Sequence, residues 1–303
     1  MLERETGRPG TANAIASALG KRVDMTQQRE EAWRPPVFTP TWTPSQRRVA
    51  SLRRFLDLQA GTVWRDMSAI LPTCEGRVLD VGCGAQPYRS LLGPRARYLG
   101  IDTAEAKAHF GYEAPDTVYF QGERWPIDDT EIDVVLCTET LEHVPDPVGF
   151  LAEAARVLRP GGKLILTVPF SARYHFIPYD YWRFTPASLE RLLASHFENI
   201  AVFARGNAVT VACYKAMALV FPLWFTQAHL RVVRFLSRAA GVALSPFVLG
   251  LAAIANISTL GSGGDDCLGY TVLARRLADP EHAVVKPEDS DVLHGLRRGR
   301  RQR

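Results

Sequence analysis

The sequence predicts an α/β fold in which a mostly parallel sheet carries helices on both faces. An apolar strand at residues 77–81 is followed by a loop with two glycines, Gly82 and Gly84. A second apolar strand at 97–101 is followed by an acid, Asp102. Further strands then alternate with helical segments, which is typical of parallel strands joined by crossover helices.

The elements can be placed along the chain from their apolar periodicity. One helix is expected from Ser45 to Leu71, because apolar residues recur there at helical spacing and Ser45 follows a proline as an N-cap. Another helix is expected to open at Asp146 or Pro147, and a third after Thr185. Strands are expected near residues 77–81, 97–101, 117–121, 132–137 and 163–168.

The glycine loop indicates a ligand that lies against the backbone. Without a Cβ, Gly82 and Gly84 can take positive φ and leave room for such a ligand. Asp102 stands where an acid after the second strand accepts hydrogen bonds from both ribose hydroxyls of a nucleotide. The loop therefore predicts a nucleoside cofactor.

Two residues favour S-adenosylmethionine over NAD as that cofactor. Asp80 precedes the loop, and Pro87 stands where the dinucleotide fingerprint needs its third glycine for close helix packing. A carboxylate is repelled by a pyrophosphate but attracts an ammonium and a sulfonium. A nicotinamide-dependent oxidoreductase stays open as a rival class.

With these residues the chain resembles the class I (Rossmann-like) S-adenosylmethionine-dependent methyltransferases. The resemblance covers about residues 75–205 and a closing strand near 268–276, and Gln86 departs from it by replacing the usual third glycine. It implies a seven-stranded, mostly parallel sheet with an antiparallel last strand, residues 200–204 and 268–275 forming the last two strands. The motifs that carry it are residues 77–84, 121–127, 132–137, 141–144 and 158–166.

The resemblance also implies how the cofactor is held. Glu123 would accept a hydrogen bond from the adenine amino group, and the Arg124 amide would meet a ring nitrogen. Trp125 and Ile127 would sandwich the adenine; the alternative is a turn with a buried aromatic residue. The remaining predicted cofactor contacts are Asp80, Gly82, Cys83, Gly84, Asp102 and, at the methionine end after the fourth strand, Cys137 and Thr138.

Cys83 is interpreted as a small loop residue rather than a nucleophile. Glu142 and His143 follow the fourth strand, near the expected approach of a substrate. His143 could remove a proton from an acceptor, because the unperturbed pKa of histidine lies near neutrality. The dipeptide could instead hold its loop in place through hydrogen bonds.

The segment 169–185 is rich in aromatic residues and resembles the DYWRFTP-type loop of a methyltransferase subgroup. In one interpretation His175 or Asp180 is a general base, while Arg183 binds a phosphate or carboxylate. In the other, Asp180 and Arg183 form an ion pair that pins the loop, and Trp182 and Phe184 fill the core. The aromatic residues predicted to grip an acceptor are Tyr179, Tyr181 and Trp182.

The chain is expected to divide into a few unequal parts. Residues 1–44 are expected to be irregular, 45–278 to form the methyltransferase domain, and 279–303 to form a charged flexible tail. Residues 207–265 are an apolar helical insertion between the last two strands. This insertion would meet a membrane interface, cover the domain or a dimer partner, or span a membrane.

Composition restricts the partners and the compartment. The formal net charge of +4 is too modest to imply a nucleic-acid surface. The 5 cysteines show no metal or disulfide spacing, so a reducing compartment and no metal site are expected. No leader opens the chain, and a cytoplasmic location, with membrane association at the cytoplasmic face as an addition, is expected.

The sequence thus predicts transfer of the sulfonium methyl group of S-adenosylmethionine by in-line displacement. Oxygen is the favoured acceptor atom, ahead of nitrogen or carbon, on a small-molecule, sugar or lipid-linked acceptor. The alternative is a non-catalytic binding or membrane-recruitment module built on the same fold. The sequence does not predict the oligomeric state.

Overall fold

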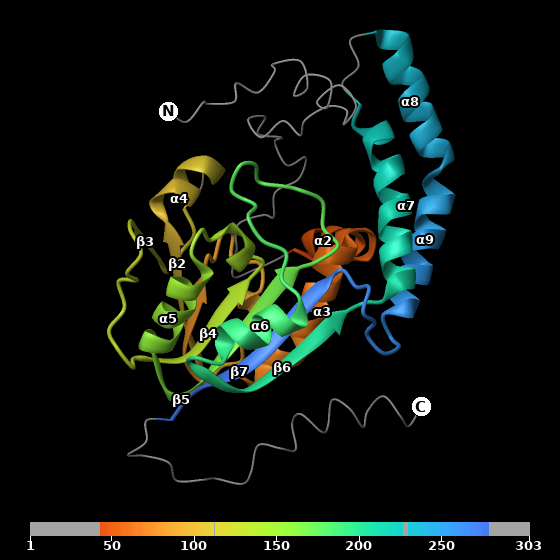
Figure 1. Ribbon diagram of the computed structural model, residues 1–303. Coiled ribbons are helices and arrows are strands. Elements are labelled where there is room, and N and C mark those ends of the chain that lie inside the picture. The colour runs from red at the N-terminus through yellow and green to blue at the C-terminus, as the bar shows by residue number, and fades with distance from the viewer. Residues whose placement is uncertain (1–42, 112, 227–229, 279–303) are drawn as a thin grey trace, which may run out of the picture.

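The computed structural model describes residues 43–111, 113–226 and 230–278 (Figure 1). The predicted tail at 279–303 lies outside the described residues, and so does the predicted irregular segment 1–44 apart from its last two residues.

Seven strands form one sheet in the order β3-β2-β1-β4-β5-β7-β6 (Figure 1). The strands from β3 to β5 are parallel to their neighbours, whereas β7 runs antiparallel to both β5 and β6. This confirms the predicted sheet with its antiparallel last strand. The bounds are β1 (Gly76–Val81), β2 (Ala96–Thr103), β3 (Thr117–Phe120), β4 (Ile132–Thr138), β5 (Leu158–Pro169), β6 (Phe197–Arg205) and β7 (Gly269–Arg276).

Helices cover both faces of the sheet because alternate strand residues point to opposite sides. Helices α5 (Pro147–Val157) and α6 (Pro186–Leu193) share one apolar cluster with Leu79, Val135 and Cys137. On the other face α3 (Leu58–Ile70) shares a cluster with Val78, Val134 and Leu136. The central strands are therefore buried on both sides, as expected for a parallel sheet. The shorter helices are α4 (Ala104–Phe110), η1 (Leu71–Thr73), η2 (Arg89–Leu91) and η3 (Leu141–His143).

The single helix predicted from Ser45 to Leu71 is two helices. Helix α2 (Pro44–Leu56) begins one residue earlier, because Thr43 and not Ser45 is its N-cap and forms a capping box with Gln46. At Asp57 the backbone turns to an extended conformation and the Asp57 carboxylate accepts the Ala60 amide, which starts α3. The sequence pattern does not show this break, because the apolar residues keep their helical spacing from one helix into the next.

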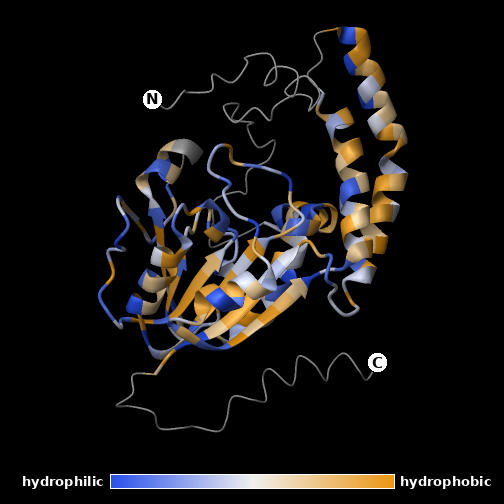
Figure 2. Ribbon diagram, in the orientation of Figure 1, coloured by the Kyte–Doolittle hydropathy of each residue, from blue (hydrophilic) through white to orange (hydrophobic). Residues whose placement is uncertain are grey.

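The insertion predicted at 207–265 forms three helices between β6 and β7 that extend away from the sheet (Figure 1). They are α7 (Ala208–Trp224), α8 (Arg231–Ala243) and α9 (Ser245–Ser258), and together they are called the arm. Residues of α7 and α9 share an apolar cluster with Leu58 of α3, which anchors the base of the arm. Figure 2 shows hydrophobic residues along the whole arm as well as in the sheet.

Among the described residues, length and composition allow no single helix to cross a membrane. The pair α8 and α9, bent by 46° at the break between them, meets the length and composition criteria only when the two helices are taken together. Helix α7 is a shorter apolar helix.

Candidate functional site

The predicted site residues gather at one edge of the sheet. Strands β1, β2, β4 and β5 are parallel, so the segments that follow them all leave at their carboxyl ends. Ligands of open α/β sheets bind at this edge.

The loop after β1 has the backbone conformation that its glycines predict. Gly82 and Gly84 have φ of +68° and +49°. A Cβ on Gly82 would lie 2.3 Å from the side chain of Thr140, so glycine is required there by space as well as by conformation. The Asp102 carboxylate accepts the Gly84 amide at 2.9 Å and the Thr103 amide at 2.8 Å. Asp102 therefore also fixes the loop, and its oxygens keep lone pairs for a ribose.

Asp80 is a buried carboxyl group with one free oxygen. Its side chain is 1% exposed; Oδ2 accepts the Tyr98 hydroxyl at 2.9 Å, and Oδ1 has no hydrogen-bond partner. Burial raises the pKa of Asp80 to about 7, the Tyr98 hydrogen bond opposes the shift, and the charge of Asp102 adds to it. A cationic group would supply the missing partner, so the site fits the ammonium of S-adenosylmethionine.

Gln86 departs from the family pattern, and the backbone conformation at its position accounts for the glycine that is usual there. Its φ is +56°, in the left-handed region that glycine reaches at no steric cost. The buried Gln86 amide donates to the Thr117 hydroxyl at 2.8 Å and also to the Pro115 carbonyl. These hydrogen bonds tie the loop to the start of β3 and offset the backbone strain.

Trp125, one of the two residues predicted to sandwich the adenine, packs inward in the ligand-free chain. Trp125 is 3% exposed and packs edge-on against Phe150, with ring centroids 5.1 Å apart. Its amide donates to the Glu153 carboxylate at 2.9 Å. Glu123 and Arg124 are exposed. This geometry is the turn with a buried aromatic residue that the alternative interpretation describes.

The cysteines near the predicted site are all buried. Cys83 is 3% exposed, and its thiol lies 3.6 Å from the Thr117 hydroxyl. Cys137 is fully buried in the core, while Thr138 is partly exposed. Burial raises the pKa of both thiols, which makes both poor nucleophiles. Thr138 is thus the more accessible of the two residues predicted at the methionine end.

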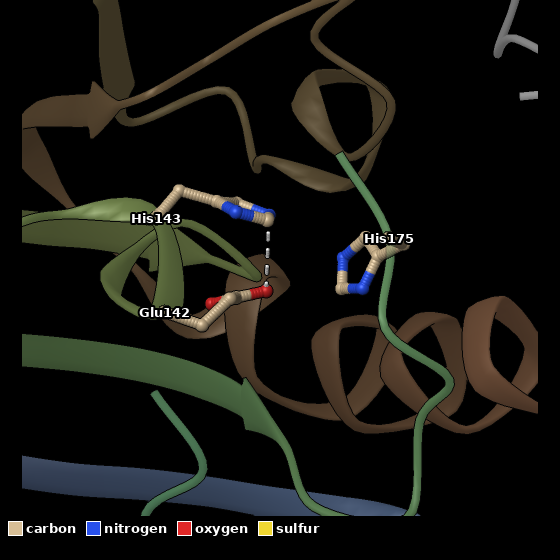
Figure 3. Close-up of side chains that lie close together, drawn as sticks. All are labelled: Glu142, His143 and His175. Atoms are coloured by element: carbon tan, nitrogen blue, oxygen red, sulfur yellow. Dashed lines mark ion pairs between the residues drawn. The ribbon is translucent and has the colours of Figure 1, made fainter. Parts of the chain in front are cut away.

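Glu142, His143 and His175 point toward one another beside the end of β4 (Figure 3). Glu142 is fully buried, and both of its carboxylate oxygens lack a hydrogen-bond partner. Burial raises the pKa of Glu142 well above its usual value, and the charge of Glu139 adds to the shift. Burial, together with the nearby His175, lowers the pKa of His143 to about 4, so its imidazole is neutral at pH 7.

Asp180 and Arg183 form the ion pair predicted by the second interpretation of the loop. Two guanidinium nitrogens of Arg183 donate to the two Asp180 oxygens at 2.6 and 2.7 Å. Burial alone would raise the pKa of Asp180, but hydrogen bonds from Arg183 and the His175 amide lower it below its usual value. Asp180 is therefore ionised and fully engaged, which suits a residue that positions the loop.

Among the four aromatic residues that the two interpretations of the loop named, Phe184 is buried and the other three are accessible. Phe184 is 4% exposed within the core, whereas Trp182 is 40% exposed and donates its indole N–H to the Val144 carbonyl at 2.8 Å. Tyr179 and Tyr181 are each 45% exposed. An acceptor could contact these three rings without displacing the core.

The ion pair between Glu139 and Arg205 was not foreseen. Glu139 has a φ of +50° at the end of β4, and its carboxylate lies 2.6 Å from a guanidinium nitrogen of the fully buried Arg205. Arg205 also donates to the Val168 carbonyl at 3.0 Å. The sequence offered one signal for this ion pair: Arg205 stands alone at the end of the apolar strand predicted at residues 200–204.

The predicted cofactor residues from Asp80 to Thr138, but not the loop after β5, lie within the part of the chain that matches a known family. Residues 79–166 match the family model described as a methyltransferase domain. A ubiquinone biosynthesis O-methyltransferase of Thiobacillus denitrificans is 38% identical over 109 residues, which cover 33% of this chain and 46% of that protein. A protein of the same name from Hahella chejuensis is 39% identical over 101 residues, which cover 30% and 42%. The chain thus spans less than half the length of these curated relatives.

Solved structures with a similar arrangement include phosphoethanolamine N-methyltransferase 2 of Haemonchus contortus, determined with S-adenosylhomocysteine. It is 16% identical, with a TM-score of 0.42 and coverage of 71% of this chain and 53% of that chain. A putative methyltransferase of Bacillus halodurans is 17% identical, with a TM-score of 0.40 and coverage of 71% and 99%.

Proposed function

We propose that this chain, whose residues 79–166 match a methyltransferase domain, transfers a methyl group from S-adenosylmethionine to an oxygen of a small-molecule, sugar or lipid-linked acceptor. The observation that carries the proposal is the pairing of two features at one edge of the sheet. The glycine turn, with Asp80 and Asp102, suits the methyl donor. The exposed aromatic rings of the loop after β5 suit an acceptor beside it.

Oxygen is the favoured acceptor atom because two similar proteins are named O-methyltransferases. When bound, S-adenosylmethionine supplies an electrophilic methyl group on a sulfonium. The acceptor oxygen would form a bond to the methyl carbon while the carbon–sulfur bond breaks. The electron pair of the broken bond would go to sulfur. Positioning of the two reactants supplies much of the rate in such a displacement.

The hydroxyl proton of the acceptor must leave during this step. His143 and His175 are the candidate bases, since Asp180 is held by Arg183. The Nδ1 of His143 lies 3.0 Å from the Tyr179 carbonyl, which can only accept a hydrogen bond. The lone pair of the neutral ring is therefore on Nε2.

Asp102→Ala tests the cofactor site. The variant should bind S-adenosylhomocysteine at least ~10-fold more weakly in calorimetry, because two ribose hydrogen bonds worth on the order of 1 kcal/mol each are lost. Glu198→Ala, an exposed acid on β6, is the matched control and should bind normally. Equal affinity of the wild type and Asp102→Ala would contradict the assignment.

A non-catalytic module is the alternative of a different class. Thermal shifts with S-adenosylmethionine, S-adenosylhomocysteine and NAD separate the possibilities, because only a ligand that prefers the native state raises the melting temperature. Incubation of lysate with cofactor carrying a labelled methyl group then identifies the acceptor fraction. Label in the lipid extract supports a lipid-linked acceptor, and absence of any labelled product together with cofactor binding supports the non-catalytic module.

The arm supports a second part of the proposal, peripheral attachment to an anionic membrane at the cytoplasmic face. Helix α8 turns Gly241 toward α7, since a Cβ on this residue would lie 2.4 Å from the Trp224 ring of α7. Its exposed apolar side chains are Val232, Val233, Phe235, Leu236 and Val242, with exposures of 45–72%. Arg231, Arg234 and Arg238 lie on the same helix. An apolar stripe beside arginines suits an interface of acyl chains and anionic headgroups.

Vesicle sedimentation tests the attachment. The full chain should sediment with vesicles that contain phosphatidylserine and less with neutral vesicles. The double variant Phe235→Ser and Leu236→Ser should lose most of this binding, because two large and exposed apolar side chains of α8 are removed. Val148→Ser on α5, 58% exposed, is the control. Full-length protein that stays in the supernatant at low salt would contradict membrane attachment.

A further inference from the structure

Three potential metal ligands from distant parts of the chain meet beside the end of β4. Glu142 and His143 belong to η3, and His175 belongs to the loop after β5. One ligand atom from each side chain lies within 4.8 Å of the other two. Figure 3 shows the three side chains directed toward a common point. We propose that Glu142, His143 and His175 bind a divalent transition-metal ion, with Zn²⁺ the best match to these ligands.

Glu142 carries the strongest indication of a missing cation. It is fully buried, and neither of its carboxylate oxygens has a hydrogen-bond partner. The distance from its Oε1 to the Nε2 of His143 is 3.6 Å, too long for a direct hydrogen bond. Buried polar groups are almost always partnered, and an unpaired buried carboxylate is costly. A metal ion between the three side chains would remove this cost.

Hydrogen bonds to the other ring nitrogens prepare both histidines as ligands. The Nδ1 of His143 donates to the Tyr179 carbonyl at 3.0 Å. The Nδ1 of His175 donates to the Arg173 carbonyl at 3.0 Å and lies 3.1 Å from the Asp180 carboxylate. In the tautomer that makes these hydrogen bonds, the ring nitrogen with the available lone pair is Nε2. Metal-binding histidines characteristically make this kind of contact to a carbonyl or carboxylate.

The charges around the three ligands also favour a cation. Glu139 is paired with Arg205, and Asp180 is paired with Arg183. Arginines neutralise these two acids, so Glu142 is the one carboxyl group of the three that is left to bind a metal. An ion bound by one carboxylate and two neutral imidazoles would leave a net positive site that attracts an anionic oxygen.

The ligand set defines the class of metal. Two imidazole nitrogens and one carboxylate oxygen suit Zn²⁺ and other first-row ions better than Mg²⁺. Ligand atoms about 2.0–2.2 Å from a tetrahedral Zn²⁺ lie about 3.3–3.6 Å apart. The observed limit of 4.8 Å means that the side chains must move inward by about 1 Å when the ion binds. Three protein ligands leave at least one position open, as in catalytic zinc sites.

His175 belongs to the loop that bears Tyr179, Tyr181 and Trp182, so we expect an acceptor held by these rings to reach the open position. The metal would occupy Nε2 of both histidines, so neither would then act as the base. An acceptor hydroxyl bound to the metal would instead lose its proton to water more readily, because the metal would stabilise the resulting oxyanion. The oxyanion would then attack the methyl carbon while the carbon–sulfur bond breaks. This role rests on the proposed methyl transfer, whereas metal binding itself does not.

Titration of the EDTA-treated, full-length protein with ZnCl₂ tests the site. Calorimetry should give one Zn²⁺ per chain, and CoCl₂ should produce visible absorption bands that Zn²⁺ abolishes. Glu142→Gln and His175→Ala should weaken Zn²⁺ binding by at least ~100-fold, since each removes one ligand. His196→Ala, which removes a histidine on the turn after α6, is the matched control and should bind Zn²⁺ normally.

Two outcomes would overturn the metal site. One is the absence of stoichiometric binding of both Zn²⁺ and Co²⁺. The other is unchanged affinity in Glu142→Gln and His175→Ala, provided that S-adenosylhomocysteine still raises the melting temperature of both variants. Zn²⁺ binding without any methyl transfer would refute the proposed function and leave the site standing. Full methyl transfer by the metal-free protein would refute the catalytic role of the metal.

Discussion

At the scale of single residues, Asp80 shows that a group suited to bind a ligand can destabilise the ligand-free protein. Its carboxyl group is buried, and only the Tyr98 hydroxyl satisfies it. An acid placed in this way destabilises the free protein when it is ionised. The same free oxygen is what a cationic ligand group requires, so the cost in stability and the capacity to bind have one origin.

Asp80→Asn should therefore change the pH dependence of stability. The native pKa is about 7 against an ordinary pKa of 3.8 for an aspartate, so the native state binds more protons than the unfolded state between these pH values. The free energy of unfolding of the wild type accordingly falls as pH rises from about 4 to about 7, by at most ~4 kcal/mol. The variant lacks this loss. Urea unfolding of the ligand-free protein across that range measures the difference.

The expected result is that Asp80→Asn gains stability relative to the wild type as pH rises through this window, while its affinity for S-adenosylhomocysteine drops. Asp128→Asn, a change at an exposed acid, should show no such trend. If the free energies of unfolding of the wild type and Asp80→Asn differ by the same amount at every pH, burial of the Asp80 carboxylate does not destabilise the protein as stated.

Individual elements differ in how tightly their glycines are packed. Gly241 in α8 faces the Trp224 ring of α7, and an added Cβ would lie 2.4 Å from it. Gly250 in α9 has nothing within 4 Å of the corresponding position. Both residues lie in helix interiors, where glycine is unfavourable relative to alanine by about 1 kcal/mol.

Gly250→Ala should thus stabilise the protein by about 0.5–1 kcal/mol. Gly241→Ala should lose that gain, because the new methyl group separates α7 from α8. Chemical denaturation compares the two variants, and limited proteolysis between α7 and α8 reports the loosened contact. Equal stabilisation by both substitutions would show that α8 does not depend on close contact with Trp224.

At the scale of the whole molecule, the arm contacts the loop after β5, which bears the residues proposed to contact the methyl acceptor. The Lys215 ammonium of α7 donates to the Ser171 carbonyl, at the start of that loop, at 2.7 Å. The base of the arm packs on α3, and Gln59 of α3 donates to the Leu268 carbonyl at 3.3 Å. The insertion is therefore connected to the site and to the domain beneath it.

Lys215→Met should raise the KM for the acceptor severalfold and leave the affinity for S-adenosylhomocysteine unchanged, because only the loop after β5 loses a contact. Steady-state kinetics and calorimetry provide the two readouts. Lys163→Met, a change on β5 away from the carboxyl edge, is the control. An unchanged KM would mean that the arm and the loop act independently.

The sequence predicted the sheet well because each strand carries its own local signal. The strand positions, the caps at Asp146 and Thr185, and the antiparallel last strand implied by family resemblance all agree with the structure. The break at Asp57 was missed because the apolar period continues across it. The sequence could not decide whether Trp125 is buried. An aromatic residue in a turn gives the same sequence pattern whether its side chain packs into the core or contacts a ligand.

By itself, the sequence predicted the fold class and indicated the methyl donor, because adjacent residues in β1 and its loop carry the pattern for both. The tertiary structure alone decided which distant side chains meet. Glu139 and Arg205 are 66 positions apart, and Glu142 and His175 belong to different elements, yet they lie beside one another at the end of β4. Such contacts depend on strand order and loop docking, which no local pattern records, and the expectation that the chain has no metal site rested on local spacing alone.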